Sequence, residues 1–205
     1  MPAPGLGRPR DPAVDQRVAD AAVRLYGDEG WAGFTVDAVA RRAGVGKASI
    51  YLRWPNKDAL LIGALAGRVV RVADIDTGSV RDDLVELARQ LLASFLGDAG
   101  RATMRLLIEA ETVPAVSGQL AELREAQILA ARAIVRRGIS RGELHPDTSV
   151  TLLLDAVGGG CLNHVLATPS HLRPAVAAGA DDYAPSLVDF VLGPGVLLEG
   201  SDRGP

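Results

Sequence analysis

A short stretch of the chain concentrates positive charge. Between Asp37 and Asp58 there is no acidic residue but five basic ones: Arg41, Arg42, Lys47, Arg53 and Lys57. Such side chains bind phosphate oxygens, so the stretch can hold a nucleic-acid backbone. The chain has a net charge of −3, yet residues 1–60 carry nine Lys and Arg against seven Asp and Glu, and residues 61–205 thirteen against eighteen. A mildly basic head on an acidic body favours DNA contact at one end only.

Two short helices joined by a glycine turn position these basic residues. Thr35 is a favoured N-cap, and Asp37 lies in the first turn, where the helix dipole favours a negative charge. Apolar residues at helical spacing give this helix one buried face: Val36, Val39, Ala40 and Ala43. Gly44 ends it, and Pro55 ends a second helix that begins at Lys47. Helices joined so closely predict a helix-turn-helix, whose second helix enters the major groove of DNA.

The second helix, residues 47–54, has two different sides. Ile50 and Trp54 are four residues apart and lie on one side, which we expect to be buried. At about 100° per residue, the other side carries small, apolar and hydroxylated residues. These are Ala48 and Leu52, flanked by Ser49 and Tyr51. This side can contact base edges in the groove.

Residues 24–60 resemble the DNA-binding end of the tetracycline-repressor (TetR) family of bacterial one-component regulators. The matching block is RLYGDEGWAGFTVDAVARRAGVGKASIYLRWPNKDAL, with an aromatic after a glycine, an Ala-Gly-Val turn, Tyr51, an aromatic-Pro-x-Lys junction and Leu60. The Gly-Arg-Pro-Arg arm at 7–10 resembles the family's N-terminal extensions, and residues 141–147 resemble one branch of its regulatory domains. The rest of the chain resembles the family in outline only.

The resemblance implies which residues contact DNA. Those expected on phosphates are Thr35, Lys47, Tyr51 and Lys57. Those expected at base edges are Ala48, Ser49 and Leu52, of which Ala48 and Leu52 suit thymine methyl groups. Arg8 and Arg10 are expected in the minor groove. The chain departs from the family at Gly46, where a Ser or Thr commonly caps the second helix, and at Leu52, where a polar residue is frequent. A known operator sequence therefore cannot be carried over.

Helical spacing of apolar residues continues along the chain without strand-like alternation. We expect an all-α fold, with a three-helix head containing the helix-turn-helix and a larger helical body for ligand binding and dimerisation. The expected parts are a flexible arm (1–10), the head (11–56), a connecting helix (57–73), the body (79–192) and a flexible tail (193–205). In the body, helices are expected from Ser79 to a break at 97–100, from there to about Pro114, and over 119–141, 148–167 and 183–192, with a loop at 169–182.

The helix expected at 148–167 is apolar on nearly every side, so more than one face must be covered. Its glycines at 158–160 each cost about 1 kcal/mol against alanine, which close approach by another helix would offset. One interpretation is an ordinary core helix. The resemblance implies the other, a homodimer interface shared with the last helix, as a palindromic operator requires. The expected interface residues are Val157, Gly158, Gly159, Cys161, Leu162, Val165, Leu187, Val188 and Val191.

Polar residues among the apolar helices of the body predict an effector pocket. Ligand sites of this kind are mostly apolar with a few polar anchors. The candidate anchors are Glu109, Thr112, Gln127 and Asn163. The alternative for each is that the side chain is solvated or bonded to a neighbour.

No catalytic or metal-binding pattern stands out in the sequence. Gly44-Val-Gly-Lys47 superficially resembles a phosphate loop, but Arg41 replaces its first glycine, and Ala48 replaces the Ser or Thr that holds magnesium. The histidines at 145, 164 and 171 lack metal spacing, and a single cysteine excludes an internal disulfide. We therefore expect no enzyme activity, no cofactor and no metal.

The sequence thus predicts a homodimeric regulator that represses nearby genes until a small molecule releases it from a palindromic operator. The alternative is a helical protein-interaction module, which leaves the acid-free basic segment unexplained. The start of the chain lacks a charged-then-apolar signal pattern, and no run approaches the roughly 20 apolar residues of a membrane span. A cytoplasmic location without membrane contact is expected.

Overall fold

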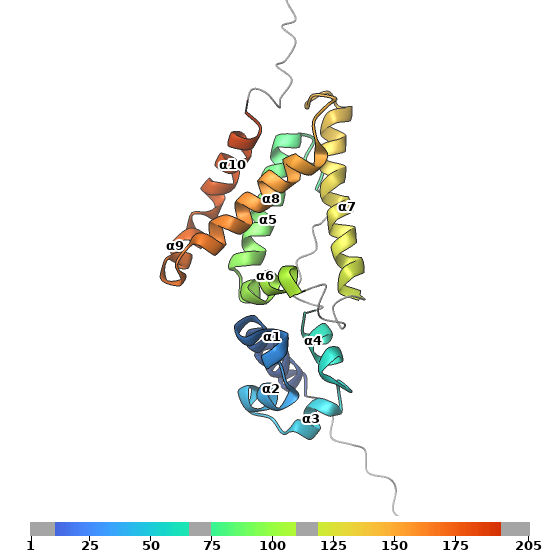
Figure 1. The fold of residues 1–205 in the computed structure, drawn as a ribbon, viewed down its shortest axis with the longest axis vertical. Coiled ribbons are helices and arrows are strands. Elements are labelled where there is room, and N and C mark those ends of the chain that lie inside the picture. The colour runs from blue at the N-terminus through green and yellow to red at the C-terminus, as the bar shows by residue number, and fades with distance from the viewer. Residues whose placement is uncertain (1–10, 66–74, 110–118, 194–205) are drawn as a thin grey trace, which may run out of the picture.

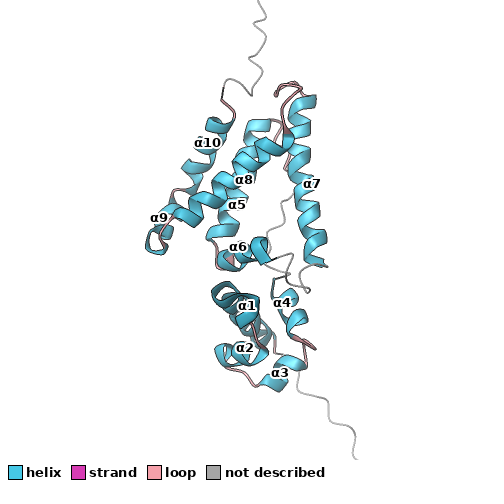
Figure 2. Cartoon of the chain, viewed as in Figure 1, coloured by secondary structure: helices cyan, strands magenta, loops and turns pink. Residues whose placement is uncertain are grey.

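The computed structural model describes residues 11–65, 75–109 and 119–193, and every regular element in these ranges is a helix. The helices form a smaller head at the bottom of Figure 1 and a longer body above it, and Figure 2 shows them by secondary structure. The expected all-α fold is confirmed. Several expectations lie outside the described residues: the arm with Arg8 and Arg10, residues 66–73 of the connecting helix, Thr112, and the tail from 194.

The head consists of α1 (Pro12–Gly33), α2 (Val36–Ala43), α3 (Lys47–Tyr51) and α4 (Lys57–Leu65). Local chemistry sets the ends of α2. Thr35 Oγ1 accepts a hydrogen bond from the Ala38 amide at 3.1 Å, and Gly44 closes the helix at a φ of 66°. The largest fully buried side chains of the head are Tyr26, Phe34, Ile50, Leu60, Leu61 and Leu65.

The winding of α1 breaks at Gly30. Gly30 has a φ of 68° and a ψ of −172°, and residues 31–33 add one further turn before Phe34. A residue with a side chain rarely adopts that φ, so the position needs glycine. The ψ value also turns the next peptide, with the amide of Trp31, out of the helical direction.

Helix α3 is shorter than the predicted 47–54. It ends at Tyr51, and Leu52 is its C-cap. The Arg53 amide donates to the Ile50 carbonyl, three residues back, at 2.9 Å, so the chain tightens as it leaves the helix. Pro55 supplies the physical reason, because a proline pushes the residue before it towards extended conformations.

The body contains α5 (Val80–Leu96), α6 (Gly100–Glu109), α7 (Gln119–Ser140), α8 (Val150–Ala167), a 3-10 turn (Ser170–Leu172), α9 (Arg173–Ala178) and α10 (Ala180–Val191). Helix α5 contacts α6, α7, α8 and α10, and α6 contacts α1 of the head. The prediction of a loop at 169–182 was wrong. Pro174 lies in the first turn of α9, where a missing amide costs no hydrogen bond, and α10 begins at Ala180.

Candidate nucleic-acid interface

Helix α3 lies at the end of the head away from the body (Figure 1). Ile50 is fully buried in the core of the head, whereas Ala48 and Tyr51 are exposed and Leu52 is 77% exposed. The two sides that helical spacing predicts for α3 are therefore present. Ile50 anchors the helix, and the opposite side is open to solvent.

The four residues expected on phosphates line a single hollow of about 340 Å³. They are Thr35, Lys47, Tyr51 and Lys57. The hollow also opens onto the first turns of α2 and α4, where helix amides and the helix dipole favour an anion. The structure thus brings these side chains together from the starts of two helices and the exposed side of a third.

Lys47 already has an acidic partner in this hollow. Its ammonium lies 2.9 Å from a carboxylate oxygen of Asp37, and the hydrogen bond to Asp37 raises the pKa of the Lys47 ammonium. Sequence reasoning placed Asp37 at the start of α2 and missed this pair. A phosphate at the hollow must therefore compete with Asp37 for Lys47, although both side chains are exposed and such pairs are weak.

Ser49 differs from the other residues expected at base edges because it is only half-exposed. Arg53 Nη1 donates to its carbonyl at 3.0 Å and to its hydroxyl at 3.1 Å, while Arg53 Nε is bonded to Asp15 on α1. Arg53 therefore ties α3 to α1. This leaves Ala48 and Leu52 as the freely exposed candidates for base contact.

Lys57 has an aromatic partner rather than an acidic one. Its ammonium lies 3.7 Å from the ring centroid of Trp31, in the last turn of α1. The Trp31 ring is stacked on buried Phe34, with ring centroids 6.0 Å apart and planes 17° apart. An aromatic residue after Gly30 is the one sequence feature that relates to this contact, and it does not predict Lys57 as the partner.

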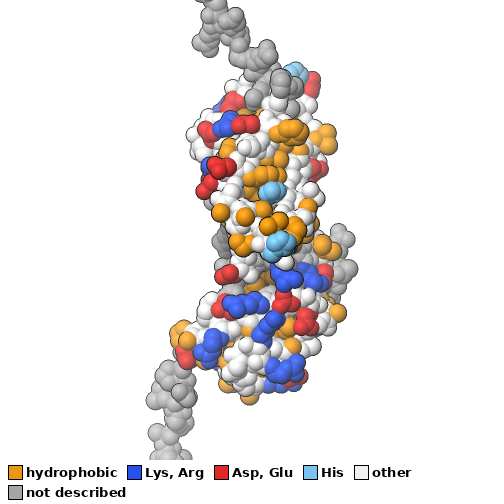
Figure 3. All heavy atoms as spheres, turned by 90° about the vertical axis from the view of Figure 1, so that its left-hand side faces the viewer, with side chains coloured by type: hydrophobic (Ala, Val, Ile, Leu, Met, Phe, Trp, Pro, Cys, Tyr) orange, Lys and Arg blue, Asp and Glu red, His pale blue; other side chains and the backbone are white. Residues whose placement is uncertain are grey.

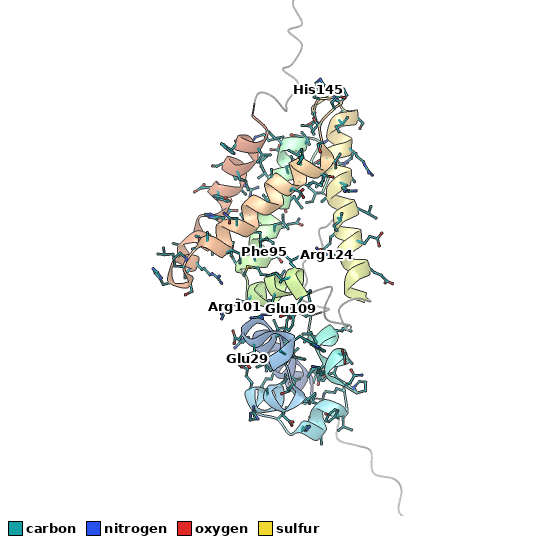
Figure 4. All side chains as sticks on the ribbon, viewed as in Figure 1. Glu29, Phe95, Arg101, Glu109, Arg124 and His145 are labelled. Carbon is teal, nitrogen blue, oxygen red and sulfur yellow. The ribbon has the colours of Figure 1, made fainter. Side chains whose placement is uncertain are left out.

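The structure places the carboxylate of Glu109 against the head, a contact that the sequence did not predict. Glu109 ends α6, and its Oε2 accepts a hydrogen bond from the Trp31 amide at 3.1 Å. The physical reason is the break at Gly30, which turns that amide outward. Figure 4 shows Glu109 and Arg101 on the side of α6 that faces α1.

The other described candidates for the effector pocket are Gln127 and Asn163. Gln127 is half-buried on α7. Asn163 is exposed on α8 and lines a hollow of about 600 Å³ with His164, Thr168 and Tyr183. The His164 and Tyr183 rings are stacked there, with centroids 3.8 Å apart. Of the described candidate anchors, only Asn163 lines this hollow.

Four residues expected at a dimer interface are instead completely buried within the subunit: Val157, Cys161, Val165 and Val188. They lie on the sides of α8 and α10 that face the body's own core. The Cys161 thiol is 3.8 Å from the Ala88 carbonyl of α5, and burial raises the pKa of this thiol to about 11. The prediction was wrong for these four because helical spacing does not show which apolar side of a helix faces the core of its own subunit and which side faces outward.

The outer side of α8 and α10 is also apolar. Gly159 and Leu152 are exposed on α8, with Leu152 70% exposed, and Phe190 on α10 is 86% exposed. Gly158, Leu162, Leu187 and Val191 are half-buried at its edges. Figure 3 shows apolar side chains gathered along this face of the body. Among the described helices, only α8 has a length and composition that would permit a membrane span.

Two family models match the chain. Residues 18–64 match the model for bacterial regulatory proteins of the tetR family, and residues 74–184 match that for tetracyclin repressor-like C-terminal domains. The regulator YdeS of Bacillus subtilis, described as uncharacterized, is 32% identical over 89% of this chain and 89% of its own. The regulator AqdR of Rhodococcus erythropolis is 33% identical over 84% of this chain and 82% of its own. Both relatives are described as HTH-type transcriptional regulators.

Solved structures share the fold. The ketosteroid transcriptional regulator KstR2 of Mycobacterium tuberculosis has a TM-score of 0.69 and 20% identity, over 94% of this chain and 98% of its own. FadR of Bacillus subtilis, solved with stearoyl-CoA, has a TM-score of 0.65 and 19% identity, over 87% of this chain and 97% of its own. At such identities the likeness concerns the arrangement of the helices.

Proposed function

The chain belongs to the tetracycline-repressor family of transcriptional regulators, and on this premise we propose that it is a homodimeric repressor that a small molecule releases from a palindromic operator. The family assignment gives a helix-turn-helix DNA-binding head and a C-terminal ligand-binding domain. The repressor role, the dimer, the operator symmetry and the release by an effector are the parts that we propose.

The hollow lined by Thr35, Lys47, Tyr51 and Lys57 is the observation that carries the proposal for DNA. With α3 in the major groove, this hollow faces the phosphate backbone, and Ala48 and Leu52 face base edges. We propose that Ser49 assists at one edge of this side, and that Arg8 and Arg10 enter the minor groove. Action on DNA also implies a cytoplasmic site of action.

The outer apolar side of α8 and α10 supports the proposed dimer. A patch that includes Leu152 and Phe190 at such exposure is costly in water and favours a protein partner. A second copy packed on this side would be related by a two-fold axis, which a palindromic operator matches. Gly159 in the middle of α8 leaves room for close approach, because its Cβ would meet no described atom within 4 Å beyond the neighbouring backbone of α8 itself.

An effector bound in the body would act by changing how the two heads are spaced. One route is the helix that begins at Lys57, which the sequence predicts to join head and body. The structure offers a second route, because α6 packs on α1. Gln127, Asn163 and Thr112 remain the proposed polar anchors for the effector, with the hollow beside Asn163 as a candidate site.

Two measurements test the proposal against the alternative of a protein-interaction module. Fragments of the host genome selected by the purified protein should share a palindrome near the genes that it regulates. Affinity for that DNA should fall steeply with salt, because each neutralised phosphate releases counterions. A protein that selects no fragment and shows no salt-dependent binding to any duplex would support the protein-interaction module.

A further inference from the structure

We propose that Glu109 positions a DNA-contacting residue from the body: it fixes Trp31, and Trp31 holds the ammonium of Lys57 at the hollow. Glu109 lies in α6, Trp31 in α1, and Lys57 begins α4. The role given to Lys57 rests on the proposed DNA-binding function. The contacts that connect the three residues belong to the structure itself and can be tested without DNA.

The first contact joins Glu109 to the backbone of α1. Oε2 of Glu109 accepts from the Trp31 amide at 3.1 Å, and the side chain is 22% exposed. A Cβ at Gly30 would lie 2.6 Å from Glu109 Oε1 and 2.5 Å from Arg105 Nη1. A glycine is therefore needed here for two reasons. It allows the positive φ, and it leaves room for the side chains of Arg105 and Glu109.

Arg105 fixes Glu109 in this place. Arg105 Nη1 lies 3.2 Å from Glu109 Oε1, and its other nitrogens donate to the carbonyls of Gly27 and Asp28 at 3.3 Å each. The end of α6 is thus held by hydrogen bonds to backbone atoms of α1. If α6 moves, the turn of α1 that contains Trp31 must move with it, or these hydrogen bonds must break.

The second contact joins Trp31 to Lys57. The indole is packed on buried Phe34, so its face is held in one orientation, and the Lys57 ammonium lies 3.7 Å from its centroid. An aromatic face attracts a cation without neutralising it. Among the described residues Lys57 therefore has no carboxylate that a phosphate must displace, whereas Lys47 on the other side of the hollow is paired with Asp37.

A separate ion-pair bridge between α6 and the head supplies a comparison. Asp28 lies 2.9 Å from Arg101 on α6 and 2.8 Å from Arg42 on α2. The two arginines are well exposed, so this bridge is weak in water. It also does not reach the hollow. The contact through Trp31 connects α6 to Lys57, which lines the hollow.

The test compares Glu109→Gln with Glu29→Gln. Glu29 is an exposed carboxylate on α1 (Figure 4), so both substitutions remove the same charge. By charge alone, each should strengthen binding to DNA. We expect Glu29→Gln to bind equally or more tightly. We expect Glu109→Gln to bind about threefold to tenfold more weakly, because the neutral amide accepts a weaker hydrogen bond from Trp31 and loses the ion pair with Arg105 that fixes the side chain. Glu109→Asp, which keeps the charge but shortens the side chain, should weaken binding as well.

A double-mutant cycle with Lys57→Met locates the effect. If Glu109 acts through Lys57, then Glu109→Gln should cause no further loss once the ammonium is gone. Equal binding by Glu109→Gln and Glu29→Gln, or an undiminished loss in the Lys57→Met background, would overturn the inference. All variants are compared at temperatures where circular dichroism shows them folded.

Fluorescence of Trp31 gives a readout that does not need DNA. Trp31 and Trp54 are the two tryptophans of the chain, so Trp54→Phe isolates Trp31. In that background, Glu109→Gln should shift the Trp31 emission and increase its quenching by iodide, and Glu29→Gln should do neither. Unchanged emission would contradict the inference, whereas failure of the parent protein to bind any duplex would contradict the proposed function alone.

Discussion

Asp83 and Arg141 join the start of α5 to the corner between α7 and α8. The Asp83 carboxylate is completely buried and lies 3.3 Å from Arg141 Nη2. It also accepts hydrogen bonds from the amide and hydroxyl of Thr77, at 2.6 and 2.7 Å. Burial opposes the ionisation of Asp83, but the hydrogen bonds from Thr77 and Arg141 outweigh it and lower its pKa. The folded body therefore holds the charged form.

Asp83→Asn should lower the free energy of unfolding by about 2–4 kcal/mol at neutral pH, because it leaves Arg141 without its buried charge partner. The pKa of Asp83 is lower in the folded than in the unfolded chain. The contribution of Asp83 to the free energy of unfolding is therefore complete at pH values above the pKa of the unfolded chain, about 3.9. It is lost as the pH falls through the pKa of the folded chain. Urea unfolding followed by circular dichroism across this pH range measures both effects.

The matched control is the neighbouring Asp82→Asn, which removes an exposed carboxylate paired with Arg81. This variant should change stability by no more than about 1 kcal/mol. Equal stability of the parent and Asp83→Asn at neutral pH would mean that the buried pair contributes nothing.

Asp37→Asn should strengthen binding to duplex DNA of any sequence by a factor of about three or more. It removes a negative charge from the hollow and releases Lys47 for a phosphate.

Lys57→Ala should do the reverse and weaken binding to specific and random DNA alike. The slope of log affinity against log salt concentration should become shallower by about one. Fluorescence anisotropy over a series of salt concentrations measures both. Identical affinities of the parent and both variants at low salt would remove the hollow from the DNA-binding surface.

Gly159→Leu should break the proposed dimer without unfolding the subunit. Beyond the neighbouring backbone of α8, a Cβ at Gly159 meets no described atom of the subunit within 4 Å, so a clash there is expected from a partner. Overpacking of this kind costs about 1–3 kcal/mol on each side of a two-fold axis. Sedimentation should show a monomer at concentrations where the parent is a dimer.

Gly160 provides the contrast for this experiment. A Cβ at Gly160 would lie 2.8 Å from Leu187 Cδ1 of the same subunit, so Gly160→Leu should lower the thermal stability of the subunit itself. A fully dimeric Gly159→Leu would exclude close helix packing at that glycine.

Leu52→Ala should relax base preference at one symmetric pair of operator positions and spare non-specific binding. The side chain is 77% exposed and cannot hydrogen-bond, so its favourable partner in the groove is an apolar edge such as a thymine methyl. The lost preference should be worth about 1–3 kcal/mol. Operators with uracil in place of thymine should weaken the parent but not the mutant. If the parent binds both operators equally at every half-site thymine, then Leu52 is only a spacer.

Features set by neighbours in the sequence were predictable. Thr35 and Gly44 bound α2 as expected, Ser79 caps α5, and Ile50 faces the core of the head. Each of these depends on capping chemistry or helical period within a few residues. The all-α fold and the family followed from the same local signals.

Features set by residues far apart in the sequence were not predictable. Glu109 lies against an amide 78 positions earlier because Gly30 turns that amide outward, which no local pattern of α6 reveals. Periodicity also identified an apolar α8 without saying which stripe faces the subunit's own core, so Val157 and Cys161 were assigned to the wrong side. The Lys57–Trp31 contact belongs to the same class, because it needs the packing of α4 on α1.

The inner stripe of α8 has a consequence for assembly. Because Val157, Cys161 and Val165 are covered by the same chain, each subunit can complete its core before it meets another. Association of folded subunits into the proposed dimer is then a separate equilibrium, and the share of dimer would depend on how much protein the cell contains. At concentrations near the dimer dissociation constant, operator occupancy would rise faster than in proportion to protein abundance, so a modest change in synthesis would alter repression more sharply than it alters protein level.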